Sequence, residues 1–250
     1  MKTRRCIVVL LLAVGAVLSA AACSDSDQIF NATPAAVYGN GNVVEQTRAI
    51  GACSSVDLQG VGNVYIQQGV REELRIRAEE NLLEYLWAEV QAGELAIWKD
   101  GVTLVNTQPI EYHLTVVDLE RVALTGAGGI QGSNLDTGPL TLLLSGVGNV
   151  EFVNLNAHWL DIESSGVGEV VLSGSVQEQT IRLRNFGNYD GRDLTSIVAD
   201  VRIGNGGSAT VRVQDHLSAT INGSGNVYYI GDPIVESSIS GSGGVVKIGE

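Results

Sequence analysis

The chain has 250 residues, of which 44% are hydrophobic and 5% aromatic, and its formal net charge at pH 7 is −13. This length allows one or two domains with a sizeable core, and 31 glycines with only 4 prolines fit a strand-and-turn protein better than a disordered one. So acidic a chain lacks the basic surface that binds DNA or RNA phosphates, and anionic lipid headgroups repel it. Nucleic acid is therefore excluded as a partner.

The N-terminus has the organisation of an export signal. Three basic residues among the first five precede an apolar run over 7–18, which is shorter than the roughly 20 residues that a membrane-spanning helix needs. Small residues follow this run. We predict that residues 1–22 are a secretory signal peptide. Because the peptide holds three cations and no acid, its removal takes the net charge from −13 to −16.

The end of this signal, Ala20-Ala21-Ala22-Cys23, resembles a bacterial lipobox, although Ala20 stands where leucine is commonest. The resemblance implies cleavage before Cys23 and lipid attachment to it, and several acyl chains on one residue anchor a protein firmly. Cleavage after an Ala-x-Ala site, with Cys23 incidental, is the alternative. Lipid on Cys23 leaves Cys53 without a disulfide partner.

Residues 23–37 are largely polar or small and lack periodicity, which predicts a flexible tether. With the signal and the lipid anchor, this organisation predicts an exported lipoprotein. We expect it at the cell surface or on the periplasmic side of a membrane, with residues 38–250 forming the displayed domain.

One glycine phrase recurs along this domain. It reads Gly-Val-Gly-Asn-Val at 146–150 and Gly-Val-Gly-Glu-Val at 166–170, and related copies begin at 39, 60, 126, 185, 205, 223 and 241. From 126 onward the copies recur with a period of about 20 residues, and alternating segments flank them. This period and alternation are typical of stacked β-coils, and the unit is too short for a βαβ repeat. We predict an all-β fold, a parallel β-helix or β-solenoid with one coil per period. The phrase would form a corner where glycine lets neighbouring coils approach closely.

The flanking segments predict which side chains stack from coil to coil. Two inward columns are expected, Leu142, Ile162, Ile181, Val201, Ala219 and Ser237, and Leu144, Ser164, Leu183, Ile203, Ile221 and Ile239. One outward column holds Leu143, Glu163, Arg182, Arg202 and Thr220. Its members would lie about 4.8 Å apart. This spacing predicts an exposed Glu163–Arg182 ion pair worth at most about 1 kcal/mol.

Between the copies at 60 and 126 the repeat is interrupted, and no glycine phrase occurs. Residues 81–88 predict either a short helix capped by Asn81 or the start of a strand. Ala92-Gly93, between two alternating segments, predicts a hairpin turn. We predict that the interruption is a hairpin-bearing elaboration near the N-terminal end, which also caps the solenoid.

A family resemblance rests on motifs distributed along this domain. They are the run over 56–69, the segment Ala78-Glu-Glu-Asn-Leu-Leu83, the repeated glycine phrases, and the closing motifs over 222–233 and 238–243. Together they resemble the domain family of unknown function called putative auto-transporter adhesin head GIN domain, over roughly 39–250. The resemblance implies a right-handed parallel β-helix-like fold in an exported bacterial protein, and a role as an adhesin or interaction module.

We find no catalytic constellation, no metal-ligand spacing and no cofactor motif, so a non-enzymatic protein without metal or cofactor is expected. The fourth phrase position holds a single carboxylate, whereas calcium needs several oxygen ligands. We therefore predict an amide and hydroxyl ladder that satisfies the corner backbone, formed by Gly129, Asn149, Glu169, Asn188, Ser208, Asn226 and Gly244.

Two alternative functions remain open from the sequence. A carbohydrate-active β-helix enzyme, a polysaccharide lyase or hydrolase, would need two carboxylates roughly 5–10 Å apart in a cleft. The available carboxylates are Glu163, Glu169, Asp190, Asp193 and Asp200. The other alternative is a structural spacer without a ligand, whose open solenoid end pairs with another subunit.

Arginines and tryptophans are the candidates for ligand contact, with a surface glycan or a protein as partner. The arginines are Arg182, Arg184, Arg192 and Arg202, with Arg212 nearby. They would dock an anionic glycan, but we favour cross-coil pairing with Glu163, Glu178, Asp190, Asp193 and Asp200. Trp87, Trp98 and Trp159 would stack on sugar rings, but we favour packing in the core or at its rim.

The lipidation of Cys23 is testable by metabolic labelling with an alkynyl fatty acid. We expect label on the wild-type protein and none on the Cys23→Ser variant, because the lipid is attached through this residue. An unlabelled wild-type protein, or label that survives the substitution, would contradict the anchor.

Overall fold

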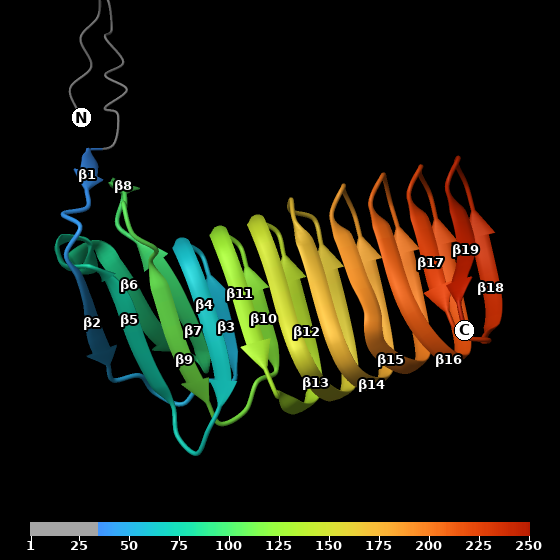
Figure 1. Ribbon diagram of the computed structural model, residues 1–250, viewed down its shortest axis with the longest axis horizontal. Helices are drawn as coiled ribbons and strands as arrows, with labels where there is room; N and C mark the ends of the chain where they lie inside the picture. The colour runs from blue at the N-terminus through green and yellow to red at the C-terminus, as the bar shows by residue number, and fades with distance from the viewer. Residues whose placement is uncertain (1–34) are drawn as a thin grey trace, which may run out of the picture. The chain divides into compact units, whose positions relative to one another are not determined.

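The structure, a computed structural model, describes residues 35–250, so the signal peptide, Cys23 and most of the predicted tether lie outside the described residues. It is a parallel β-solenoid of about six turns, which confirms the predicted fold class (Figure 1). The strands are β1 Ala36–Tyr38, β2 Val43–Arg48, β3 Ser55–Leu58, β4 Val61–Gln68, β5 Glu73–Glu79, β6 Leu86–Gln91, β7 Glu94–Lys99, β8 Thr103–Val105, β9 Glu111–Val116, β10 Arg121–Leu124, β11 Ala127–Ser133, β12 Asp136–Leu144, β13 Val147–Ser164, β14 Glu169–Leu183, β15 Asn188–Ile203, β16 Ser208–Ile221, β17 Asn226–Ile230, β18 Ile234–Ile239 and β19 Gly244–Gly249. One 3-10 helix, η1, covers Glu80–Tyr85. Residues 35–250 contain no helix with the length and hydropathy of a membrane span.

Successive coils are in the predicted register. Leu142 pairs with Ile162, which pairs with Ile181, and both inward columns continue in this way to β18. Their members are buried up to β16, and β18 is exposed along its whole length. The outward column from Leu143 to Thr220 also has the predicted register.

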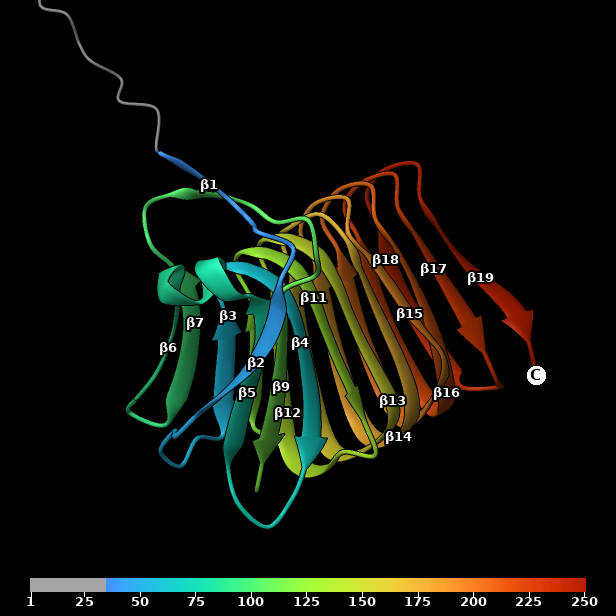
Figure 2. The same ribbon diagram turned by 60° about the vertical axis from the view of Figure 1, so that its left-hand side comes forward.

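Each coil has three sides, as the strand β13 shows. Inward residues alternate with outward ones, except at two pairs of consecutive exposed residues, 153–154 and 158–159, where the chain bends. We call the segment that directly follows the glycine corner the first side (150–152 in β13), the next the short side (155–157), and the last the third side (160–164). Figure 2 shows the coils stacked one behind another along the solenoid axis.

The glycine phrase lies at the corner of each coil, as predicted. A Cβ atom added to Gly148 would lie 1.6 Å from the carbonyl oxygen of Gly128, and one added to Gly168 would lie 1.7 Å from that of Gly148. Both residues also have positive φ, 141° for Gly148 and 151° for Gly168. Only glycine combines this backbone conformation with such a close approach, so the phrase permits the coils to stack.

The interruption between the copies at 60 and 126 extends and closes the N-terminal end of the solenoid. The two copies themselves lie in adjacent coils, since β4 pairs directly with β11 and β3 with β10. Beyond β4 the first side continues through β9, β5 and β2, and beyond β3 the third side continues through β7 and β6. The predicted hairpin joins β6 and β7 through Ala92 and Gly93, which both have positive φ.

Three details of this end differ from the predictions. The phrase at 39–43 is not a coil corner, because β2, which follows it, pairs antiparallel with β5. Residues 81–85 are helical as one alternative predicted, but Asn81 lies inside η1 and its amide donates to the Tyr38 carbonyl instead of capping the helix. Ala36–Tyr38 pairs with β8, so regular structure begins before the predicted end of the tether at residue 37.

A buried carboxylate holds this end together. Glu79 is fully buried and accepts hydrogen bonds from the Gly41 N–H at 2.6 Å, the Thr107 N–H at 2.8 Å and the Thr107 hydroxyl at 2.7 Å. The hydrogen bond from the Thr107 hydroxyl is the largest cause that lowers the pKa of Glu79, and burial opposes it. Gly39 has no room for a side chain, since an added Cβ would lie 2.0 Å from the Glu79 carboxylate. The glycines at 39 and 41 therefore admit this carboxylate.

A substitution at the corner tests the stacking geometry. Gly148→Ala should lower the free energy of unfolding by more than about 2 kcal/mol, because the new methyl group collides with the preceding coil at a positive φ. Urea unfolding followed by circular dichroism measures the change. Gly138→Ala is the matched control, because Gly138 has open space around its Cβ position. Equal stability of the two variants would contradict the role of the corner.

The role of Glu79 predicts a pH dependence. Its pKa is lower in the folded state than the value of about 4.3 in an unfolded chain, so its stabilising contribution is present above that pH and is lost as the pH falls through the folded pKa. Glu79→Gln should therefore reduce the thermal midpoint most at neutral pH, and the difference from wild type should shrink in acid. The exposed neighbour Glu80, changed to Gln, should have little effect at either pH. A Glu79→Gln deficit that is independent of pH would contradict the assignment.

Candidate functional site

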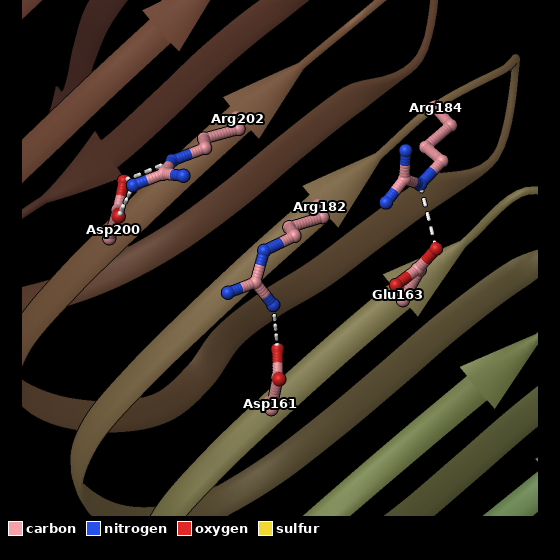
Figure 3. Close-up of polar contacts among 6 residues, drawn as sticks. All are labelled: Asp161, Glu163, Arg182, Arg184, Asp200 and Arg202. Carbon is pink, nitrogen blue, oxygen red and sulfur yellow. Dashed lines mark hydrogen bonds and ion pairs between the residues drawn. The ribbon is translucent and has the colours of Figure 1, made fainter.

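Three of the candidate arginines lie on the third side, and each has a carboxylate partner (Figure 3). Arg182 pairs with Asp161, Arg184 Nε lies 2.7 Å from Glu163 Oε1, and Arg202 pairs with Asp200 at 2.7 Å. The predicted Glu163–Arg182 pair is wrong. Glu163 and Arg182 are direct cross-strand neighbours, but the side chains of Arg182 and Arg184 lean along the strand and reach the carboxylate of the diagonal neighbour on β13. Arg202 instead pairs with Asp200 of its own strand, so the favoured cross-coil pairing is wrong for this arginine.

The fourth candidate arginine does not join this group. Arg192 lies ten positions before Arg202 in the same strand, β15, close to the bend after the first side. Its Nε lies 2.9 Å from the Asp190 carboxylate, and its carbonyl accepts a hydrogen bond from Arg212 at 2.8 Å. The four candidate arginines therefore do not form one basic patch, and their charge is balanced by neighbouring carboxylates.

The tryptophans are also separated. Trp87 and Trp98 face each other across the β6–β7 hairpin, with ring centroids 6.4 Å apart and nearly parallel rings. Trp159 lies in β13 at the bend between the short and third sides, and 36% of it is exposed. The structure thus provides a tryptophan pair and one single ring, and no shared platform.

The fourth phrase position forms the amide part of the predicted ladder, whereas the Ser208 hydroxyl makes no hydrogen bond within the described residues. The side-chain oxygens of Asn149, Asn188 and Asn226 accept hydrogen bonds from the backbone N–H groups of Glu169, Ser208 and Gly244, at 2.9–3.1 Å. These amides satisfy the backbone of the next coil at its corner. Among residues 35–250 no group of three histidine, cysteine, aspartate or glutamate side chains is placed to hold a metal ion.

Cys53 has no disulfide partner within the described part of the chain and is buried. Burial raises the pKa of its thiol, which disfavours the reactive thiolate.

A surface hollow lies on the first side of the solenoid. Its volume is about 330 Å³, and outward side chains of the strands β9, β4, β11 and β13 line it. Tyr65 stacks on His113 there, with ring centroids 5.1 Å apart and an interplanar angle of 15°. The His113 side chain points outward and is partly exposed. Its Nε2 lies 3.4 Å from Glu111.

A second hollow of about 220 Å³ adjoins the first along the solenoid axis and shares Glu151 and Val153 with it. Asp190, Arg192 and Asp193 lie at its far end. We call the two hollows together the axial groove. Its outward row runs one residue per strand through His113, Tyr65, Gln131, Glu151, Val171 and Asp190.

Two polar groups of this row are free to bind a ligand. Among the described residues, Gln131 and Glu151 make neither a side-chain hydrogen bond nor an ion pair, and both are exposed. By contrast, Arg75, which lines the first hollow, lies 3.1 Å from Glu73 and 3.8 Å from Glu45. The groove therefore combines an aromatic stack with an unpaired amide and an unpaired carboxylate.

Of the groove residues, Arg192 was among the sequence-derived ligand candidates, whereas Tyr65, His113, Gln131 and Glu151 were not. Tyr65 belongs to the resembling run over 56–69, but its neighbours His113 and Gln131 lie far from it in the sequence. The one available signal was the outward position of residues 65 and 131, each of which directly follows the last residue of its glycine phrase, Val64 and Ile130 respectively. The partner His113 depends on the pairing of β4 with β9, which the repeat does not predict.

A second exposed feature follows the corners. The second phrase position holds Val147, Val167 and Phe186, whose exposed fractions are 59%, 66% and 76%. Val147 and Val167 bridge directly, and the Phe186 ring lies over Gly206, where a Cβ would come within 2.7 Å of it. These residues form an apolar ridge, and contiguous exposed apolar side chains commonly mark an interaction surface.

Comparison with known proteins shows which solved structures share this fold. No curated protein matches the sequence. A putative adhesin of Bacteroides fragilis NCTC 9343 has a similar structure, with a TM-score of 0.82 and 24% identity over 85% of this chain and 100% of that chain. A putative lipid binding protein of Parabacteroides distasonis ATCC 8503 has a TM-score of 0.66 and 22% identity over 85% of this chain and 99% of that one. A putative adhesin of Parabacteroides merdae ATCC 43184 has a TM-score of 0.61 and 20% identity, over 86% and 99%. At these identities the likeness establishes the fold alone.

The sequence profile of one family matches residues 53–233, most of the solenoid. The match begins at the buried Cys53 before β3 and ends after β17, so it includes the glycine corners from 60 to 223 and the axial groove. The repeat, the solenoid and this match agree: the chain belongs to the family described as putative auto-transporter adhesin, head GIN domain.

Proposed function

We propose that this protein is a non-catalytic adhesin-type binding module, displayed at the outside of a cell by a lipid anchor on Cys23. The observation that carries the proposal is the extended, preformed surface of the solenoid. Close backbone contacts at the glycine corners fix the spacing of the coils. The axial groove and the apolar ridge lie on the surface that these coils form. A rigid surface loses little conformational entropy when it binds, which favours recognition of extended partners.

The placement of this surface follows from the N-terminal organisation. The signal over 1–22 would export the chain, the lipid would hold Cys23 at a membrane, and the tether would carry the solenoid away from it. The membership of an adhesin-type family supports an extracellular or surface location. Cell surface and periplasmic face are both compatible with the sequence.

The ion pairing of the carboxylates argues against the glycosidase alternative. Glu163, Asp190 and Asp200 each lie beside an arginine, which stabilises the ionised carboxylate and disfavours a proton-donating role. Lyase chemistry would need a base beside a bound sugar acid, and the arginines that would bind such a sugar are engaged by these carboxylates. We therefore favour binding over catalysis.

The spacer alternative has a specific place in the fold. Among the described residues β18 and β19 leave an edge unpaired, and Ile239 in β18 is 44% exposed. Pairing of this end with another subunit stays a prediction.

The binding role is testable with cells that express the full chain. We expect such cells to be retained several-fold better than empty-vector cells on at least one of three surfaces: immobilised glycoproteins, extracellular-matrix proteins, or a layer of other bacteria. Cys23→Ser should abolish the gain, because the protein then loses its attachment to the cell. Immunoblotting confirms export in each strain. Equal retention on all three surfaces, with the protein exported, would overturn the proposal.

A further inference from the structure

We infer that the axial groove binds an uncharged saccharide chain that lies along the solenoid axis. This inference rests on the proposed binding function and names its ligand class and site. Four features of the groove carry it: an aromatic face, a pair of free polar groups, the local charge and the direction of the groove.

The aromatic face belongs to Tyr65. One face of its ring is covered by His113 of the neighbouring strand β9, at a centroid distance of 5.1 Å. The opposite face is turned toward β11 on the other side, where Gln131 is the cross-strand neighbour and the hollow lies. A pyranose ring presents a flat apolar face of C–H groups, and an aromatic ring offers that face a large and rigid contact.

The polar pair follows directly along the same row. Gln131 and Glu151 are cross-strand neighbours of β11 and β13, so their side chains leave the surface about 4.8 Å apart. The amide offers a donor and an acceptor and the carboxylate two acceptors, and neither is used within the described residues. Adjacent hydroxyl groups of a sugar both donate and accept hydrogen bonds, so this pair complements a vicinal diol.

The charge of the groove selects against an anionic chain. Its two arginines, Arg75 and Arg192, are paired with Glu73 and Asp190. Glu151 and Asp193 line the groove with no ion-pair partner among residues 35–250, and they leave it net negative. Sulfated or uronic-acid polymers would meet like charge there, whereas a neutral saccharide would not.

The direction of the groove implies a chain instead of a single sugar. Its outward row crosses six consecutive strands from His113 to Asp190 at about 4.8 Å per step, which makes it about 24 Å long. The row is perpendicular to the strands and parallel to the solenoid axis. A linear oligosaccharide of several units matches this shape. An extended peptide would instead pair with a strand edge, and the groove lies on the face of the sheet.

An array of neutral and anionic oligosaccharides, probed with the exported full chain in detergent, tests the inference. We expect binding to one or more neutral linear saccharides, with affinity measured by calorimetry on the strongest of them. Tyr65→Ala and Glu151→Gln should each weaken that affinity by about tenfold or more, through loss of the ring contact and of a charge-assisted hydrogen bond.

Two matched controls lie outside both hollows on the same side of the coils. Tyr228→Ala removes a tyrosine from the continuation of the same outward row on β17, and Glu169→Gln changes a carboxylate on the neighbouring row of β14. Both should bind like the wild type. Glu151 is exposed, so Glu151→Gln keeps the test valid if Tyr65→Ala proves unstable.

Three outcomes would overturn the inference: no neutral saccharide bound, binding of anionic saccharides alone, or equal loss of affinity in the groove variants and the controls. If cells that express the protein are still retained but no neutral saccharide binds, the groove assignment is wrong and the binding role stands. If neither retention nor saccharide binding is observed, both proposals are wrong.

Discussion

The close approach of backbone to backbone at the glycine corners is the constraint on which this fold depends. At Gly148 and Gly168 the carbonyl oxygen of the equivalent glycine in the preceding coil occupies the place that a Cβ atom would need. A side chain at either position would push two coils apart, and every coil beyond would shift with them. The corners thus convert the period of the sequence into a fixed rise from coil to coil. This is why the phrase tolerates variation at its fourth position, where side chains point outward, while its third position is glycine in every copy.

A fixed rise determines what the outward side chains can do. Each residue lies one strand spacing from the equivalent residue of the next coil. Short side chains therefore contact that equivalent residue or its backbone, whereas long side chains reach residues two positions away along the neighbouring strand. The amides of Asn149 and Asn188 therefore reach the backbone of the coil that follows. Arg182 and Arg184 are too long for their direct neighbours and pair with carboxylates two positions back along the preceding strand. In the interior the same stacking admits one polar chain, in which the Tyr189 hydroxyl donates to Gln179 and Gln179 donates to Ser196, all of them buried.

This dependence on the period explains what the sequence could predict. The solenoid, the inward columns and the asparagine ladder depend only on spacing and alternation, and the structure confirms each of them. The ion-pair partners were mispredicted because spacing alone does not describe how far a side chain leans along its strand. Glu79 was missed because its partners, Gly41 and Thr107, come from two segments outside the period. The phrase at 39–43 has the motif without the corner, since its glycines make room for that carboxylate. The repeat predicts the structure correctly where the glycine phrase and the segments that flank it recur together.

The same reasoning locates the groove. In the regular coils an outward row carries residues that the repeat supplies, such as Arg182 and Arg202, which pair with nearby carboxylates. Where the interruption returns to the solenoid, β9 places His113 beside Tyr65, and the antiparallel β5 adds Arg75. Neither residue belongs to the repeat, so the row acquires the aromatic stack of Tyr65 on His113. The stack leaves Gln131 and Glu151 as the next members of the row, on coils whose own neighbours offer them no partner. The repeated coils provide a rigid surface along the whole solenoid. The residues that distinguish one part of this surface from the rest lie where the repeat is interrupted.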